Sequence, residues 1–250
     1  MEKRREIPWP RIFAESIAIV VSILLAFWIQ AWWDGRQERS EERELLVTLM
    51  EEFEEKKRLY LYTSKYIQGI KDSVNELLDI ALNSELDASE EHIDRLIGYT
   101  WWFADPEIWR PGALNSLIAS GDMGLISNRE LRAVLNDWWM EFGKIEQYSI
   151  VDRDFGNNRQ TPFLARHASL PQILNATKQQ PGHPSVTYEH GKEYMIESRV
   201  SHSELLANRE YQNILAERSS HLTDLLTFAL YDFEARADQT MALLRQELNE

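Results

Sequence analysis

Residues 12–33 read IFAESIAIVVSILLAFWIQAWW, and this apolar run decides the fold that the sequence predicts. A helix that spans a bilayer needs roughly 20 consecutive, mostly apolar residues. The run supplies that length with one charged residue, Glu15, in its interior. We therefore expect a single transmembrane helix over residues 12–33.

Tryptophans bracket this run. Trp9 precedes it, and Trp28, Trp32 and Trp33 lie at its end. Because indole rings favour the headgroup level of a bilayer, these four residues are the expected interface anchors. A cleaved signal peptide fits less well, since its apolar region is shorter and ends in small residues.

The segment before the run, residues 1–11, is short and basic, with Lys3, Arg4, Arg5 and Arg11. Basic tails stay in the cytoplasm, whereas a long C-terminal domain crosses a membrane largely regardless of its charge. We therefore expect a cytoplasmic tail over residues 1–11 and an extracytoplasmic domain over residues 34–250.

Small side chains recur every fourth residue along the run and are followed by an amide. The row consists of Ala14, Ala18, Ser22, Ala26 and Gln30. Residues four apart share one face of a helix. In lipid, small residues let two helices approach, and polar ones bond across the contact. The row predicts a helix-packing face for a partner subunit or for a second copy of the chain.

Glu15 is an ionisable residue inside an apolar segment, and such residues are candidates for function. It lies one helical turn from Arg11, with which it could pair near the membrane surface. Because the run contains no further acid, we favour an anchoring or partner-contacting role over proton transfer.

The rest of the chain is acidic, and the formal net charge of the protein is -14. A nucleic-acid partner requires a basic face, so this charge argues against one. There is no cysteine, which excludes disulfides and thiolate chemistry.

The chain becomes polar at Asp34-Gly35, and residues 36–82 then predict one very long helix. Apolar residues recur at spacings of three and four, which is the pattern of a seam between packed helices. Lys56 and Thr63 interrupt it. The helix could form a coiled coil between copies or one arm of an intramolecular bundle. The seam comprises Leu46, Leu49, Phe53, Tyr60, Ile67, Ile70, Val74 and Leu77.

Helical patterns continue to the C-terminus. We expect helices over residues 87–102, 112–119, 127–154 and 201–250, with loops and short helices over 155–191. No segment shows the alternation of a strand. The predicted fold class is all-α, a single N-terminal transmembrane helix followed by a bundle of long helices.

Trp101, Trp102 and Trp109 belong to the densest aromatic cluster of the body. Large aromatic residues dominate ordinary hydrophobic cores, and we favour that interpretation. The alternative is a partner-binding patch, because exposed aromatic clusters mark interaction surfaces.

No motif indicates catalysis, so we expect a protein that is not an enzyme and has no cofactor. The triplet Asp154-Phe155-Gly156 matches part of a kinase signature, but the other kinase motifs are missing. The histidines are scattered rather than spaced as metal ligands, so we expect no metal site. They include His167, His183, His190 and His202.

Several stretches resemble an uncharacterised family of bacterial single-pass membrane proteins with a helical domain of unknown function. The similar stretches are residues 15–17, 29–36, 44–46, 117–121 and 125–131. Ser22 stands where that family more often has glycine. The resemblance implies a membrane anchor plus a helical domain in a bacterial protein, and it implies no activity. With the orientation argued above, we expect a bacterial inner-membrane location with the C-terminal domain in the periplasm.

Together these features predict a non-catalytic accessory or scaffolding subunit of a larger bacterial membrane protein complex. Its expected partners are other membrane subunits, or further copies of itself, and the lipid bilayer. The alternative hypothesis is a membrane-bound sensor or signalling protein that acts through a partner.

Overall fold

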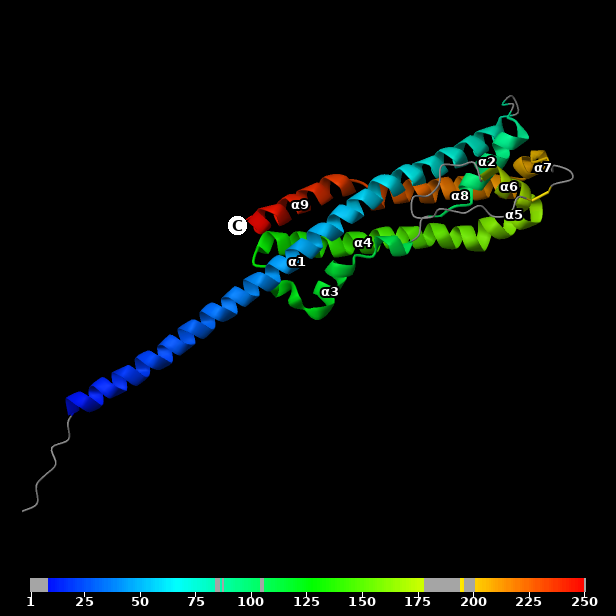
Figure 1. Cartoon of the computed structure of the whole chain (residues 1–250). Coiled ribbons are helices and arrows are strands. Elements are labelled where there is room, and N and C mark those ends of the chain that lie inside the picture. The colour runs from blue at the N-terminus through cyan, green and yellow to red at the C-terminus, as the bar shows by residue number, and fades with distance from the viewer. Residues whose placement is uncertain are drawn as a thin grey trace, which may run out of the picture.

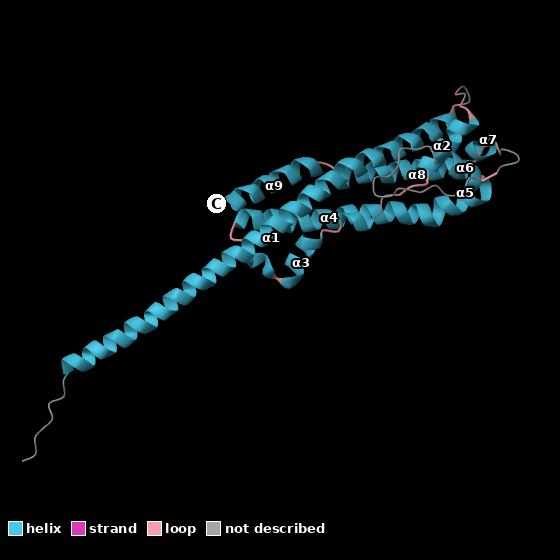
Figure 2. Cartoon of the chain, in the orientation of Figure 1, coloured by secondary structure: helices cyan, strands magenta, loops and turns pink. Residues whose placement is uncertain are grey.

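The computed structural model describes residues 9–83, 86, 88–103, 106–177, 194–195 and 201–249. Within these ranges every regular element is a helix and none is a strand (Figure 2), so the predicted all-α class is confirmed. The elements are α1 (Trp9–Leu82), α2 (Glu90–Thr100), η1 (Pro106–Trp109), α3 (Gly112–Ser120), η2 (Asp122–Leu125), α4 (Arg129–Phe155), η3 (Gly156–Gln160), α5 (Thr161–His167), α6 (Leu170–Thr177), α7 (Ser203–Ala207), α8 (Arg209–Asp224), η4 (Leu225–Ala229) and α9 (Phe233–Asn249).

The α1 helix is a single rod of 74 residues whose N-terminal part projects away from the other helices (Figure 1). The sequence predicted separate helices over residues 12–33 and 36–82, but one helix continues through Asp34 and Gly35. A glycine inside a helix costs only about 1 kcal/mol relative to alanine, which the flanking helix formers offset.

The predicted transmembrane helix over residues 12–33 requires a correction. Among the residues that the structure describes, no helix combines the length and the apolar character that crossing a membrane requires. Instead of ending at the boundary of the apolar run, α1 continues without a break into charged sequence.

The predicted seam of α1 is the centre of the core. Its aliphatic residues and Phe53 are at most 3% exposed between Leu46 and Leu77. They pack mainly against α2, α8 and α9 of the same chain. The seam therefore belongs to an intramolecular bundle, and the alternative of a coiled coil between copies is not needed to cover it.

The two exceptions in the seam are also accommodated. Thr63 is buried like its apolar neighbours. Lys56 donates from Nζ to the carbonyl oxygen of Ile108 at 2.7 Å. Partial burial lowers the pKa of Lys56, because the charged ammonium loses contact with water.

Aromatic rings join α1, α4 and α9 at the middle of the bundle. The Trp138 ring lies 5.4 Å from Phe53 and 5.0 Å from Phe233, both in edge-to-face geometry. The indole Nε1 of Trp138 donates to Thr240 Oγ1 at 2.7 Å, so its one polar group is satisfied inside the core.

The segment expected to form one helix over residues 201–250 is broken twice. Asn208 caps α8, since its side chain accepts from the backbone N–H of Glu210. Asp232, with a φ of 57°, turns the chain between η4 and α9. Aspartate tolerates this left-handed conformation better than most residues. These breaks let α8 and α9 each follow the α1 seam.

Glu52 on α1 holds the start of α3. Its Oε1 accepts from the N–H groups of Gly112 and Ala113, and its Oε2 accepts from Leu114 N at 3.0 Å. This contact spans 60 or more residues of sequence, and it satisfies three backbone donors that the helix itself leaves unpaired.

Replacing Glu52 with alanine should lower the free energy of unfolding by about 1–2 kcal/mol, because a charged cap is lost. Urea denaturation followed by circular dichroism measures this change. Glu51→Ala, at the exposed neighbouring position, is the matched control and should have almost no effect. Equal unfolding free energies for the two variants would contradict the capping role.

Candidate functional site

The N-terminal part of α1, residues 17–33, is called the arm below. Ser22, Ala26 and Gln30 of the predicted packing row are exposed on it. The predicted anchors Trp28, Trp32 and Trp33 are exposed as well. The remaining predicted residues, Trp9, Ala14, Glu15 and Ala18, belong to α1, but their side chains lie outside the described ones.

The arm is apolar on every side. Three successive residues, Phe27, Trp28 and Ile29, are 65%, 67% and 51% exposed, and together they point in different directions around the helix. No described part of the chain covers them. Near the end of the arm, Trp32 contacts Trp33 at 6.4 Å between ring centroids, and Arg36 lies 5.7 Å from the Trp32 ring.

The three tryptophans of the possible partner patch lie in or against the core. Trp109 is 0% exposed and packs on Phe233. Trp101 and Trp102 are half-buried, and Trp101 Nε1 donates to Thr161 Oγ1 at 2.9 Å. These three tryptophans therefore pack in or against the hydrophobic core of the body. The sequence analysis favoured a core role over a partner-binding patch.

Truncating Trp109 to alanine should therefore lower the free energy of unfolding by about 3–5 kcal/mol, as for other large core residues. Trp139→Ala is the control, because Trp139 is 48% exposed. Thermal and urea unfolding of both variants measure the difference. A stable Trp109→Ala variant would contradict the core role.

A buried polar cluster centred on Arg218 lies between α4, η3 and α8. Arg218 is 0% exposed. Its Nη1 donates to Gln160 Oε1 at 2.6 Å, and its Nη2 donates to the carbonyl oxygen of Trp102. Its guanidinium also lies 4.2 Å from the centroid of the Phe103 ring. Arg218 therefore fixes the chain that leaves α2.

Gln160 extends the cluster to α2. Its Nε2 donates to the carbonyl oxygen of Thr100 at 2.8 Å and to Thr100 Oγ1 at 3.0 Å. Gly156 lies so close to Phe103 that a Cβ atom there would overlap the ring. The cluster thus depends on close approach of η3 to the loop after α2.

Asp152 on α4 is the counter-ion of Arg218. Its Oδ1 lies 3.6 Å from Arg218 Nε, and both side chains are at most 1% exposed. Neither Asp152 oxygen accepts a hydrogen bond from the described residues. Burial raises the pKa of Asp152, and the neighbouring positive charge of Arg218 opposes that rise.

Sequence reasoning missed this cluster, although a signal was present. Arg218 occupies a position in the buried stripe of α8 that also contains Ile214 and Leu222. Asp152 similarly follows Ile145 and Ser149 along the buried side of α4. A charged residue at an apolar stripe position indicates a buried partner. The sequence does not say which of the distant charges that partner is.

A second buried pair joins α2 to the residues before α7. His202 Nε2 lies 2.5 Å from Asp94 Oδ1, and neither side chain is more than 1% exposed. Gln172 Nε2 donates to both Asp94 oxygens at 2.9 and 3.0 Å. Glu90 accepts from the backbone N–H of His202 at 3.1 Å. This arrangement closes the end of the bundle that contains α6 and α7.

The other histidines differ in their surroundings. His167 stacks on Phe163 at 4.3 Å, whereas His183 and His190 lie outside the described residues. Within the described ranges no group of three or more histidine, aspartate or glutamate side chains is placed to hold a metal ion. The triplet Asp154-Phe155-Gly156 lies at the junction of α4 and η3, inside helical structure.

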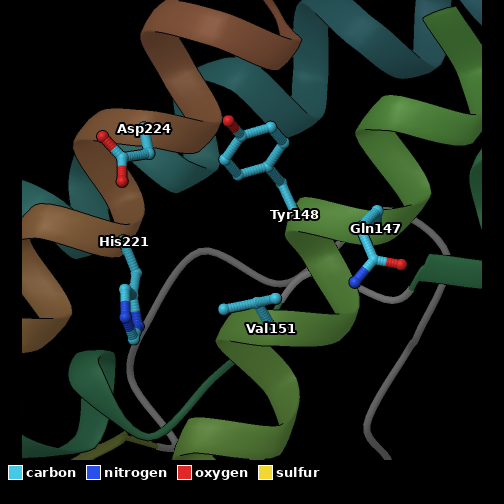
Figure 3. Close-up of a pocket in the computed structure, with 5 residues that line it drawn as sticks. All are labelled: Gln147, Tyr148, Val151, His221 and Asp224. Atoms are coloured by element: carbon cyan, nitrogen blue, oxygen red, sulfur yellow. The ribbon is translucent and has the colours of Figure 1, made fainter.

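Two hollows open on the body. One, of about 110 Å³, lies between α4 and α8 and is shown in Figure 3. The other is a wider groove of about 550 Å³ between α1 and the η4–α9 junction, with Tyr60, Tyr231 and Asp232 among its lining residues. Lys57 pairs with Asp238 at the edge of this groove at 2.6 Å.

A scan of protein families, a search of characterised proteins and a search of solved structures each found no match to this chain. What the structure establishes is thus the class of protein, an all-α bundle whose first helix continues as an apolar arm.

Replacing Arg218 with methionine should lower the free energy of unfolding by about 3–5 kcal/mol, because Asp152 then remains buried without its counter-ion. The loop at Trp102 and Phe103 should also loosen, which tryptophan fluorescence reports. Arg209→Met, at an exposed position on the same helix, is the control. Unchanged stability and fluorescence in Arg218→Met would contradict the central role of Arg218.

Proposed function

We propose that the protein is a non-catalytic accessory or scaffolding subunit of a larger bacterial membrane protein complex. In this proposal the arm of α1 packs against other subunits and the helical body docks on their polar surfaces. The bacterial inner-membrane location rests on the family resemblance. The attachment requires only that the arm be enclosed by apolar surfaces of its partners.

The observation that carries the proposal is the exposure of the arm. Soluble monomers rarely display contiguous apolar patches beyond a few hundred Å², and larger ones mark interaction sites. Here the large apolar side chains that the structure describes between Ile17 and Trp33 are each at least 50% exposed. A helix that is apolar all round is normally buried among other apolar groups.

The row of Ser22, Ala26 and Gln30 suggests where the closest contact forms. Small residues let a neighbouring helix approach the backbone, and an amide can bond across the contact. The described part of the row lies on one side of the arm, since its members are four residues apart.

The test is native co-purification of the full chain from bacterial membranes in a mild detergent, followed by mass spectrometry. The wild-type chain should recover a fixed set of membrane subunits. Ser22→Leu combined with Ala26→Leu should reduce their recovery at least about tenfold, because bulky side chains prevent close helix packing.

The control is Val20→Leu combined with Leu24→Phe. These positions lie about 200° around the helix from Ser22 and Ala26, and both changes enlarge an apolar side chain, although by less than the changes at Ser22 and Ala26 do. The control should retain the partners. Recovery of no partner by the wild-type chain, or equal recovery by all variants, would refute the proposed attachment.

A further inference from the structure

The hollow between α4 and α8 adjoins the buried cluster. Its lining residues are Gln147, Tyr148, Val151, His221 and Asp224. In Figure 3, Tyr148 and Val151 project from α4 toward α8, which carries His221 and Asp224. Each of the two helices continues into a π-helical turn, η3 after α4 and η4 after α8. Such turns are frequent at functional sites.

Asp152 directly follows the lining residue Val151 on α4. It is 1% exposed, and both of its oxygens lack a hydrogen-bond donor among the described residues. The 3.6 Å separation from Arg218 Nε is an ion-pair distance and too long for a good hydrogen bond. An ionised carboxylate held in this way is poorly stabilised, since water and donors are both withdrawn from it.

His221 lines the hollow and acts electrostatically on Asp152. It lies almost one helical turn beyond Arg218 on α8. Its Nδ1 is buried without a hydrogen-bond partner among the described residues, and its ring lies edge-on to Phe155 at 5.0 Å. A positive charge on His221 acts electrostatically on Asp152.

We propose that Asp152 is a proton-binding site between α4 and α8, next to the hollow that its neighbour Val151 lines and under the electrostatic influence of His221, which lines the same hollow. Among the described residues, Arg218 is the charged group at ion-pair distance from Asp152. Arg218 also donates to Gln160 and to the carbonyl oxygen of Trp102, so its guanidinium has partners besides Asp152. Tyr66 and Tyr211 lie near Arg218, and burial raises the pKa of Tyr211, so that phenol stays neutral.

The sign of the pH dependence follows from three contributions to the pKa of Asp152. Burial raises it and is the largest, while the charges of Arg218 and His221 lower it, and the net direction is upward. The folded protein therefore binds this proton more tightly than the unfolded chain does. Stability should fall as pH rises above the ordinary aspartate value and through the raised value of the folded state.

The first experiment is urea unfolding of the full chain from about pH 4 to about pH 8, a range that starts near the ordinary aspartate pKa. The wild type should lose stability across the lower part of this range relative to Asp152→Asn, which has no carboxyl group to titrate. Asp122→Asn, at an exposed position, is the control and should follow the wild type. The same pH dependence in all three proteins would overturn the proposal.

The second experiment uses the wild-type carboxyl group, so it does not depend on whether a variant of Asp152 folds. Carboxyl ¹³C NMR of the folded wild-type chain follows the titration of Asp152 directly. Its midpoint should lie above the ordinary aspartate value, because burial of the carboxyl group is the largest contribution to its pKa. His221→Gln should move the midpoint further upward, because a nearby positive charge is removed. A midpoint at or below the ordinary value, or one that His221→Gln leaves unchanged, would overturn the proposed site.

Discussion

The apolar stripe of α1 between Leu46 and Leu77 is the surface on which the rest of the body is built. A helix that presents such a stripe is stable only when other helices cover it. Helices α2, α8 and α9 do so, and they reach it from widely separated parts of the sequence (Figure 1). At about 1.5 Å per residue the stripe is long enough for α8 and α9 to lie along it one after the other. The turn at Asp232, between η4 and α9, lets the two helices contact α1 one after the other.

Polar contacts position the segments of the body that do not pack along the apolar stripe of α1. Glu52 holds the start of α3, Arg218 holds the loop after α2, and Asp94 with His202 closes the far end. Buried polar groups favour a fold only when their partners are in place, since a lone buried charge is costly. Most members of these clusters are satisfied. Both carboxylate oxygens of Asp152 are buried without a hydrogen-bond donor among the described residues, as are Arg218 Nε and His202 Nδ1.

The arm differs from the body because its large apolar side chains are exposed, whereas those of the body are buried. Burial of apolar surface contributes roughly 25 cal/mol per Å², so a helix with exposed tryptophan, phenylalanine and isoleucine side chains gains strongly from a covering surface. The body has used its own helices to cover the α1 seam, and none of the described elements lies along the arm. The covering surface we propose therefore belongs to other subunits, which makes attachment to them the natural role of the arm.

Spacing along the chain was sufficient to predict the all-α class and the long α1 seam, because a helix repeats every 3.6 residues and its buried side is visible in local sequence. Hydropathy was a poorer guide to the N-terminal run, because it did not show that the run belongs to one helix that continues into charged sequence as far as Leu82. The ends of the C-terminal helices also differed from expectation. They depend on Asn208 and Asp232, single residues whose turn conformations compete with strong helical patterns on either side.

The sequence by itself determined which residues of each helix face inward, because that follows from periodicity. It also determined that the chain is acidic and that its N-terminal run is apolar. Only the tertiary structure decided that Asp152, Gln160 and Arg218 meet, and that Glu52 reaches α3. Those contacts join residues that lie 58 to 66 positions apart in the sequence. Their distances depend on how whole helices pack against one another, which no local sequence pattern encodes.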